Sequence, residues 1–486
     1  MSVARALALN TIIQVAGKVV STITGILIIS LMTRRLGAAG FGDYSTANAV
    51  LQVFALMMDL GINVTFPAML GERSNDPAFQ QRAFASIFTL RVVMSVVVLL
   101  GIAPLVGFLW PFPWQVKLAI VALSLSYVFP GIQQILIGVQ QQRLRMTLST
   151  VAENVGRLTT IFGLLVSPYF GWGVVAQCWI ISTSSAIVFA INAWSTHRFL
   201  PIRWRWDPSF WLTVLKRSWP VGVSIALNLI YYKADALILQ YFRPAAEVGV
   251  YGAAYRILEV LITIPFLYAG VLLPVLSRTW EERKPQEMSQ LISRSLDVML
   301  LLIIPLIVGV RWFGVPLMTF ISGPEFAFSG FIARILMLGV AAIYLNTILS
   351  HAIVALQAQR KMLPAYALVA ALTLAGYLFY IPQAGATAAA WLTVFSEVSI
   401  LLASTLTVWG YVRFAPSGRT LIGSLASAAC MWGVAAWTQS FPLLAGIMMS
   451  GCTYVIALAL TQTVTPTTVK NLLSIKDPGM PPARDT

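Results

Sequence analysis

The sequence predicts an all-α integral membrane protein with about fourteen transmembrane helices. Of its 486 residues, 58% are hydrophobic and only 10% are charged, whereas a soluble domain carries about 25% charged residues. Apolar stretches of roughly 20 residues, long enough to cross a hydrocarbon core about 30 Å thick, follow one another along the whole chain. Strands of a membrane β-barrel would be about 10 residues long and would alternate in polarity, which these stretches do not. No room is left for a separate soluble domain.

The expected spans are separated by connections that contain most of the charged residues. In chain order the spans cover residues 9–32, 44–66, 84–109, 116–139, 148–168, 173–193, 219–241, 249–274, 291–312, 331–355, 363–381, 385–408, 420–438 and 442–463. The three cysteines and two histidines are scattered along the chain, so we expect neither a disulfide framework nor a metal site.

Lysines and arginines gather on one side of the membrane. If the N-terminus is cytoplasmic, the cytoplasmic segments hold most of the 32 basic residues, and the other side holds only Arg34, Arg35, Lys117, Arg243 and Arg311. By the positive-inside rule, both termini then lie in the cytoplasm, and we expect a multi-pass protein of the bacterial inner membrane. The net charge of +15 therefore has a topological explanation and gives no indication of nucleic-acid binding.

The connections on the opposite side are all short. A membrane glycosyltransferase, polymerase or ligase usually needs a sizeable external loop to carry acid, base or sugar-binding groups. The sequence also contains no Walker loop for nucleotide binding. We therefore expect no catalytic residues, no enzyme activity and no cofactor.

An internal repeat relates the first twelve spans. RRLGAAGFGDYSTANAV aligns with QYFRPAAEVGVYGAAYRI, which places Gly42 on Gly249 and Tyr44 on Tyr251, 207 residues apart. Two further matches follow in the same order: GVQQQRLRM with ALQAQRKML, and GVVAQCW with GATAAAW. A parallel repeat of six helices predicts two pseudo-symmetric lobes around a central cavity, related by an axis along the membrane normal. We assign the lobes to 1–200 and 201–410, two additional helices to 411–465, and a cytoplasmic tail to 466–486.

The same segments resemble the Wzx-type oligosaccharide flippases, the polysaccharide-exporter branch of the multidrug/oligosaccharidyl-lipid/polysaccharide (MOP) superfamily. The resemblance lies in the RRLGAAGFGDYS junction, the DLGI of Asp59 to Ile62, the QQQRLRM turn, and KADALILQYFRPAAEVGVYGAAYRI from Lys233 to Ile257. It implies two lobes that open alternately to each face and carry undecaprenyl-pyrophosphate-linked oligosaccharide from the cytoplasmic to the periplasmic leaflet. The transported units would be used to synthesise a surface polysaccharide, namely O-antigen, capsule or exopolysaccharide. The implied partners are this lipid-linked oligosaccharide, membrane lipid and the polysaccharide polymerase machinery.

Several cations lie inside the expected spans, where a charge costs several kcal/mol unless it is paired or hydrated. Our hypothesis is that they form a hydrated cationic cavity that attracts the pyrophosphate through charge-assisted contacts. The members are Lys18, Arg91, Lys233, Arg157 and Arg256. A structural interpretation stands beside this one. Glu153 precedes Arg157 by four residues and Glu259 follows Arg256 by three, so each pair can close on its own helix.

Two carboxylates inside spans are candidates for ion coupling. Asp235 lies two residues from Lys233 and therefore points to a different side of the helix, so the two do not simply neutralise each other. Glu397 lies deep in the twelfth span without a partner at helical spacing. For both residues, a structural contact with another helix is the alternative interpretation.

Two other transport functions stay open at this point. A lipid II flippase would differ only in the sugar that it carries. A small-cation antiporter of the multidrug-extrusion branch should present a carboxylate-rich pocket, against which the intramembrane cations argue. The sequence specifies neither the glycan nor the energy source, which could be protons, sodium or the membrane potential.

Overall fold

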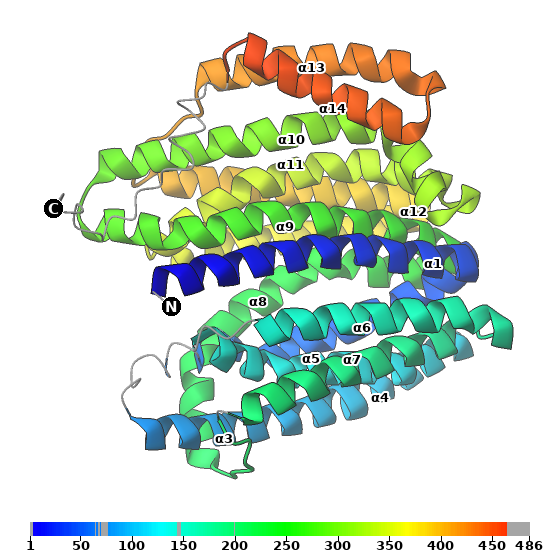
Figure 1. The fold of residues 1–486 in the computed structure, drawn as a ribbon, viewed down its shortest axis with the longest axis vertical. Coiled ribbons are helices and arrows are strands. Elements are labelled where there is room, and N and C mark those ends of the chain that lie inside the picture. The colour runs from blue at the N-terminus through cyan, green and yellow to red at the C-terminus, as the bar shows by residue number, and fades with distance from the viewer. Residues whose placement is uncertain are drawn as a thin grey trace. The chain divides into compact units, whose positions relative to one another are not determined.

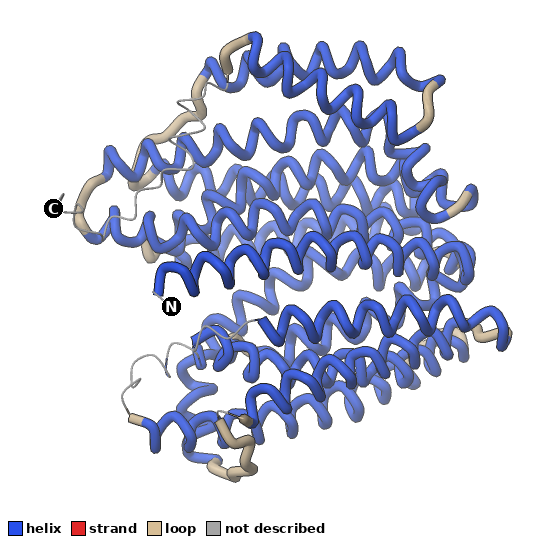
Figure 2. Tube along the Cα trace, viewed as in Figure 1, coloured by secondary structure: helices blue, strands red, loops and turns tan. Residues whose placement is uncertain are grey.

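The computed structural model describes residues 3–63, 65–66, 69, 76–142, 147–198 and 200–463. Every regular element among these residues is a helix (Figure 2). Ten helices of the described part are long and apolar enough to cross a membrane. The predicted all-α, multi-pass membrane fold is therefore confirmed.

The helices follow the expected spans closely, each span falling on a helix, on one arm of a bent helix, or on a run of consecutive helices (Figure 1). In order they are α1 (Val3–Asp59), α3 (Pro77–Ser95), η1 (Val96–Ile102), α4 (Ala103–Leu109), α5 (Trp114–Gln142), α6 (Thr147–Val166), η2 (Ser167–Phe170), α7 (Val174–His197), α8 (Pro208–Phe242), α9 (Ala245–Glu281), α10 (Pro285–Ser322), η3 (Pro324–Phe326), α11 (Ala327–Ala355), α12 (Gln359–Trp409), α13 (Gly418–Trp437), η4 (Thr438–Ser440) and α14 (Leu443–Leu460). The η1 segment is a π-helix directly before Pro104, which lacks the N–H of a regular helical bond.

The two longest helices each contain two of the expected spans. Helix α1 bends at Gly37, with φ 63°, and α12 bends at Gly385, with φ 56°. Glycine adopts a positive φ at little cost because it has no Cβ. Each bend separates two predicted spans, so each long helix consists of two arms, 3–36 and 38–59 in α1.

Both bends are closed by a carboxylate from another helix or its neighbouring turn. Glu325 accepts a hydrogen bond from the backbone N–H of Ala38 at 3.0 Å, and Glu247 accepts one from that of Ala386 at 2.7 Å. These N–H groups begin the second arms, where helical carbonyl partners are missing and a negative charge is favourable. Neither carboxylate was predicted from the sequence to contact a bend.

The chain divides into two compact units. The first comprises Met1–Leu261, Met318–Leu336 and Lys361–Ile400, and the second comprises Ile262–Leu317, Met337–Arg360 and Leu401–Thr486. Within the second unit, Tyr454 of α14 donates to the carbonyl of Leu301 in α10 at 3.0 Å, so the predicted C-terminal helix pair is present and packed. The lobe boundaries at 200 and 410 stay predictions, and the tail 466–486 lies outside the described residues.

Corresponding helices of the internal repeat pack against each other in the first unit, where the second arm of α1 contacts α9 (Figure 1). A Cβ added to Gly42 would lie 1.8 Å from the carbonyl oxygen of Ala245, and one added to Gly249 would lie 2.0 Å from that of Ala38. The contact is reciprocal because 38 and 245, like 42 and 249, are separated by the repeat offset of 207. Each helix thus presents a small-xxx-small motif, which lets membrane helices approach closely.

Candidate functional site

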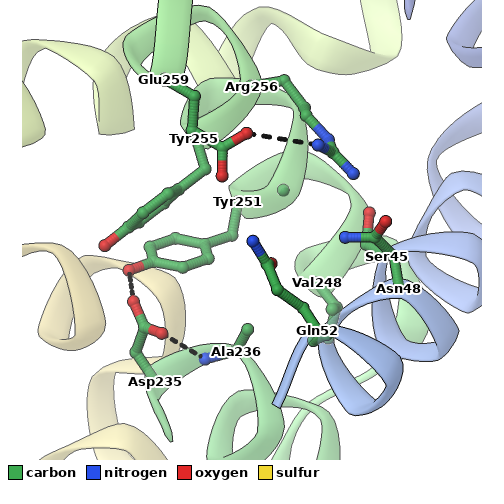
Figure 3. A pocket seen from close by; sticks show the side chains of 12 residues that line it. Ser45, Asn48, Gln52, Asp235, Ala236, Val248, Tyr251, Tyr255, Arg256 and Glu259 are labelled. Atoms are coloured by element: carbon green, nitrogen blue, oxygen red, sulfur yellow. Dashed lines mark hydrogen bonds and ion pairs between the residues drawn. The ribbon is translucent and has the colours of Figure 1, made fainter. Parts of the chain in front are cut away.

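A narrow polar pocket, with a cavity volume of about 40 Å³ and about 470 Å³ when the open solvent at its mouth is included, lies at this helix crossing, within the first unit (Figure 3). Its walls are the second arm of α1, the C-terminal part of α8 and the first part of α9. Most of the lining consists of residues related by the 207-residue offset. The pairs are Ser45 with Gly252, Asn48 with Tyr255, Ala49 with Arg256, and Gln52 with Glu259. The pocket therefore lies on the local twofold axis of the repeat.

The frame of this pocket is symmetric, but its chemistry is not. The first half supplies Asn48 and Gln52, which are neutral and polar, where the second half supplies an aromatic ring and a carboxylate. Ala49 stands at the position that corresponds to Arg256 in the repeat. Among the described lining residues, all formal charge comes from the second half of the chain, since Asp235 of α8 also belongs to it.

Arg256 is the cation that the pocket presents. Its Nη1 lies 3.2 Å from Oε2 of Glu259, three residues later on α9, and its Nη2 donates to the hydroxyl of Tyr44 at 3.4 Å. The arginine and glutamate side chains keep 29% and 27% of their surface exposed. A guanidinium has five N–H donors, so these two contacts leave Arg256 able to donate to an anion in the pocket.

Asp235 anchors a chain of hydroxyl groups behind the pocket. It is buried, accepts from the backbone N–H of Ala236 at 2.7 Å, and accepts from the hydroxyl of Tyr251 at 2.5 Å (Figure 3). The Tyr251 hydroxyl lies 3.5 Å from that of Thr393, which in turn lies 3.3 Å from that of Tyr377. These contacts join α8, α9 and α12 by polar groups alone.

Glu397 lies one helical turn beyond Thr393 on α12. It is 6% exposed, and among the residues that the structure describes none forms a hydrogen bond or ion pair with it. Glu397, the second predicted ion-coupling residue, therefore lies on the helix that this chain of hydroxyl groups reaches, but it is not itself joined to the chain by a hydrogen bond among the described residues.

The other predicted cations lie elsewhere or outside the described side chains. Arg91 is 1% exposed and its guanidinium is shared between Asp59 and Asn63. This ion pair joins α3 to the end of α1.

Arg157 pairs with Glu153 at 3.1 Å on α6, and Ser21 of α1 donates to the same carboxylate at 2.5 Å. Lys18 lies on α1 and Lys233 on α8, but their side chains are outside the described part of the structure. Of the five predicted cations, Arg256 therefore lines this pocket, whereas Arg91 and Arg157 form ion pairs away from the described lining.

Several lining residues were missed because they carry no charge. Ser45, Asn48 and Gln52 stand 207 residues before Gly252, Tyr255 and Glu259, so the repeat offset applied to Arg256 and its neighbours could have found them. No comparable signal marked Tyr377 and Thr393. Among the described residues, no three His, Cys, Asp or Glu side chains group closely enough to hold a metal ion.

The fold and the repeat are those of a known family. The sequence model of the family described as polysaccharide biosynthesis protein matches residues 7–280. The chain belongs to this family. A second family model, MatE, matches residues 220–381. The pocket residues of α8 and α9 lie where the two matches overlap, and the predicted membership of the MOP superfamily is confirmed.

One relative in this superfamily is "Probable flippase AglR" of Haloferax volcanii, 23% identical over 313 residues. The match spans 62% of this chain and 62% of that relative, so it covers less than two thirds of the relative's length. The named relatives are transporters and flippases rather than enzymes.

Solved structures share the fold at low sequence identity. The lipid II flippase MurJ in an inward closed conformation is 14% identical, with a TM-score of 0.76 over 96% of this chain and 100% of that one. An inward-facing multidrug resistance MATE transporter of the MOP superfamily is also 14% identical, with a TM-score of 0.65 over 81% and 93% of the two chains. A MOP superfamily transporter from Pyrococcus furiosus gives a TM-score of 0.59 at 12% identity, over 83% and 94%.

Proposed function

We propose that this protein is a flippase that moves undecaprenyl-pyrophosphate-linked oligosaccharide from the cytoplasmic to the periplasmic leaflet of the bacterial inner membrane. The carried unit would serve surface polysaccharide synthesis, and both termini would lie in the cytoplasm. The observation that carries the proposal is the polar pocket on the repeat axis, with the partly exposed guanidinium of Arg256 in its wall. The family match and the flippase name of one relative support it.

The lining suits the polar head of such a lipid. Arg256 would donate to the pyrophosphate or to a sugar acid, because a charge-assisted contact with an anion is stronger than a neutral hydrogen bond. Asn48, Gln52 and Ser45 offer both donors and acceptors, as sugar hydroxyls require. Tyr255 offers a ring face to a sugar. The lipid tail would stay in the membrane, and no covalent step is needed.

The reciprocal crossing of α1 and α9 gives the site a pivot. Tilting about the close contact of Gly42 and Gly249 would open the same pocket first to one side and then to the other, as alternating access requires. The other members of the proposed cationic cavity stay Lys18, Lys233, Arg91 and Arg157. Of these, Lys233 lies nearest in sequence to the pocket residue Asp235.

We further propose that Asp235 and Glu397 couple transport to ion movement. The hydroxyls of Tyr251, Thr393 and Tyr377 lead from Asp235 to α12, the helix that carries Glu397, and can both donate and accept. A change of protonation or ion occupancy at one carboxylate would therefore be felt along hydrogen bonds that join three helices.

The test of function is deletion of the gene followed by identification of the lipid-linked glycan that accumulates in the cytoplasmic leaflet. The proposal expects an undecaprenyl-linked repeat unit to accumulate and surface polysaccharide to be lost. Accumulation of lipid II with arrested wall synthesis would instead identify a lipid II flippase. Normal polysaccharide combined with new sensitivity to cationic drugs would identify an antiporter, which the MatE match makes the second candidate.

The test of the site is Arg256→Gln, with Arg278→Gln as the matched control. Both arginines lie on α9 and pair with a glutamate three or four residues later in the chain, but Arg278 is half exposed and does not line the pocket. Loss of one charge-assisted contact costs about 1.5–3 kcal/mol, so export should fall about tenfold or more. Arg256→Lys should retain part of the activity. Normal export by Arg256→Gln at wild-type membrane levels would disprove the assigned role.

A further inference from the structure

A second pocket lies in the first unit, between the start of α3 and the start of α8, and nothing in the proposed transport cycle uses it. It measures about 960 Å³ including its open mouth. Arg82 of α3 and Arg217 of α8 supply the charge, and Ser209 and Thr213 supply hydroxyls. The remaining wall contains Phe79 and Phe210, whose rings pack edge to face at 6.3 Å. We name it the α3–α8 basic pocket.

The connection between α7 and α8 fixes the geometry of this pocket. Arg82 donates through Nε and Nη2 to Oδ2 of Asp207, at 3.0 and 2.7 Å. Trp211 donates from Nε1 to the carbonyl of Ser86 at 2.9 Å. These contacts hold the first turns of α8 against α3, so the two arginines and the aromatic wall keep their relative positions.

The surroundings of the pocket are strongly basic. Between 198 and 217 the chain carries five basic residues and one acid: Arg198, Arg203, Arg205, Lys216 and Arg217 against Asp207. That single carboxylate already contacts Arg82 and lies 3.6 Å from Arg205. The segment 198–217, which forms one side of the pocket, therefore carries a net charge of +4.

Tryptophans place this region at the membrane surface. Trp204 and Trp206 keep 69% and 68% of their surface exposed, and Trp206 packs edge to face on Trp211 at 4.6 Å. Exposed tryptophan is typical of the level of the lipid headgroups. At this level, the two arginines of the pocket can contact the phosphate of a lipid, and its aromatic wall can contact the first carbons of the same lipid.

We propose that the α3–α8 basic pocket binds the headgroup phosphate of an anionic phospholipid of the leaflet on the side we assign to the cytoplasm. Arg82 retains N–H donors beyond the two given to Asp207, since a guanidinium has five. Basic pockets between transmembrane helices on the cytoplasmic side are suited to anionic headgroups. A free phosphate would satisfy the arginines but would leave the wall of Phe79 and Phe210 uncovered, so a lipid fits better.

The experiment measures binding of phosphatidylglycerol to the purified full-length protein in phosphatidylcholine nanodiscs, by native mass spectrometry and by the thermal unfolding midpoint. Phosphatidylglycerol should bind and raise the midpoint, and the effect should weaken with salt. Arg217→Gln should weaken binding about fivefold, which corresponds to about 1 kcal/mol for one basic residue at the membrane surface.

Lys216→Gln is the matched control, because it removes the same charge from the next residue of α8 but does not line the pocket. It should change binding clearly less than Arg217→Gln, and both variants should unfold like wild type in phosphatidylcholine alone. Equal weakening by both would overturn the pocket in favour of diffuse attraction. Two results would overturn the assignment to a phospholipid. One is that inorganic phosphate raises the unfolding midpoint as much as phosphatidylglycerol does. The other is that undecaprenyl phosphate at equal concentration displaces phosphatidylglycerol completely.

Discussion

Replacing Gly249 with alanine should damage both the stability of the protein and its transport. The new Cβ would lie 2.0 Å from the carbonyl oxygen of Ala38, whereas ordinary Cβ contacts begin at 3.4 Å, so the backbones of α1 and α9 would have to separate locally by about 1.4 Å. Overpacking of this kind costs about 1–3 kcal/mol. The higher helix propensity of alanine returns about 1 kcal/mol at most. The loss is a sizeable part of a total stability of about 5–15 kcal/mol.

The assay compares thermal unfolding in detergent and polysaccharide export in cells for Gly249→Ala and Gly270→Ala. Gly270 lies on the same helix, and a Cβ there would meet nothing within 4 Å, so its alanine variant should be neutral or slightly stabilised. Gly42→Ala should resemble Gly249→Ala because the contact is reciprocal. An unchanged midpoint and normal export for both crossing variants would refute the close contact and the pivot built on it.

Three further outcomes follow from single contacts. Arg91→Gln leaves the carboxylate of Asp59 without its buried partner, so it should destabilise the protein by about 3 kcal/mol in thermal unfolding. The double variant that also carries Asp59→Asn should recover part of this lost stability, because the unpaired charge is then removed. Hydrogen bonds from an arginine hold the pKa of Asp207 at about 2, below its ordinary value of 3.8, so its stabilising effect is complete above about pH 4 and is lost as the pH falls toward 2. The unfolding midpoints of wild type and Asp207→Asn should therefore converge on acidification, and a constant gap would contradict this. Tyr251→Phe removes a donor from Asp235 and should alter the pH dependence of export, whereas an export profile like that of wild type would exclude this hydroxyl from coupling.

Much of the fold could be read from the sequence because the membrane imposes a simple rule on each segment. An apolar run must be helical in lipid, since its backbone groups have no other partners. The expected spans accordingly fall on the observed helices. The merging of spans into bent helices at Gly37 and Gly385 was not predicted, because it depends on a carboxylate from a distant segment that satisfies the first N–H after each bend.

The site was only partly accessible for a related reason. Helical spacing reveals partners on the same helix, and it correctly paired Arg157 with Glu153 and Arg256 with Glu259. It is blind to partners on other helices, so the ion pair of Arg91 could not be found. The neutral lining residues Ser45, Asn48 and Gln52 were not predicted, because the sequence criterion for a site candidate was a charge inside a span.

The repeat offset was the stronger guide to the pocket, although it was used only for the fold. Residues 207 apart meet across the axis, so the alignment that identified Gly42 with Gly249 also specifies which side chains face each other one and two turns further along. A strictly symmetric pocket would place equal charges on opposite walls, where they would repel across a short distance. Here Ala49 corresponds to Arg256 and Gln52 corresponds to Glu259, so among the described lining residues of these two helices only α9 carries charge. Arg256 would then hold an anionic headgroup from the α9 side, and Ser45, Asn48 and Gln52 of α1 would contact the sugars.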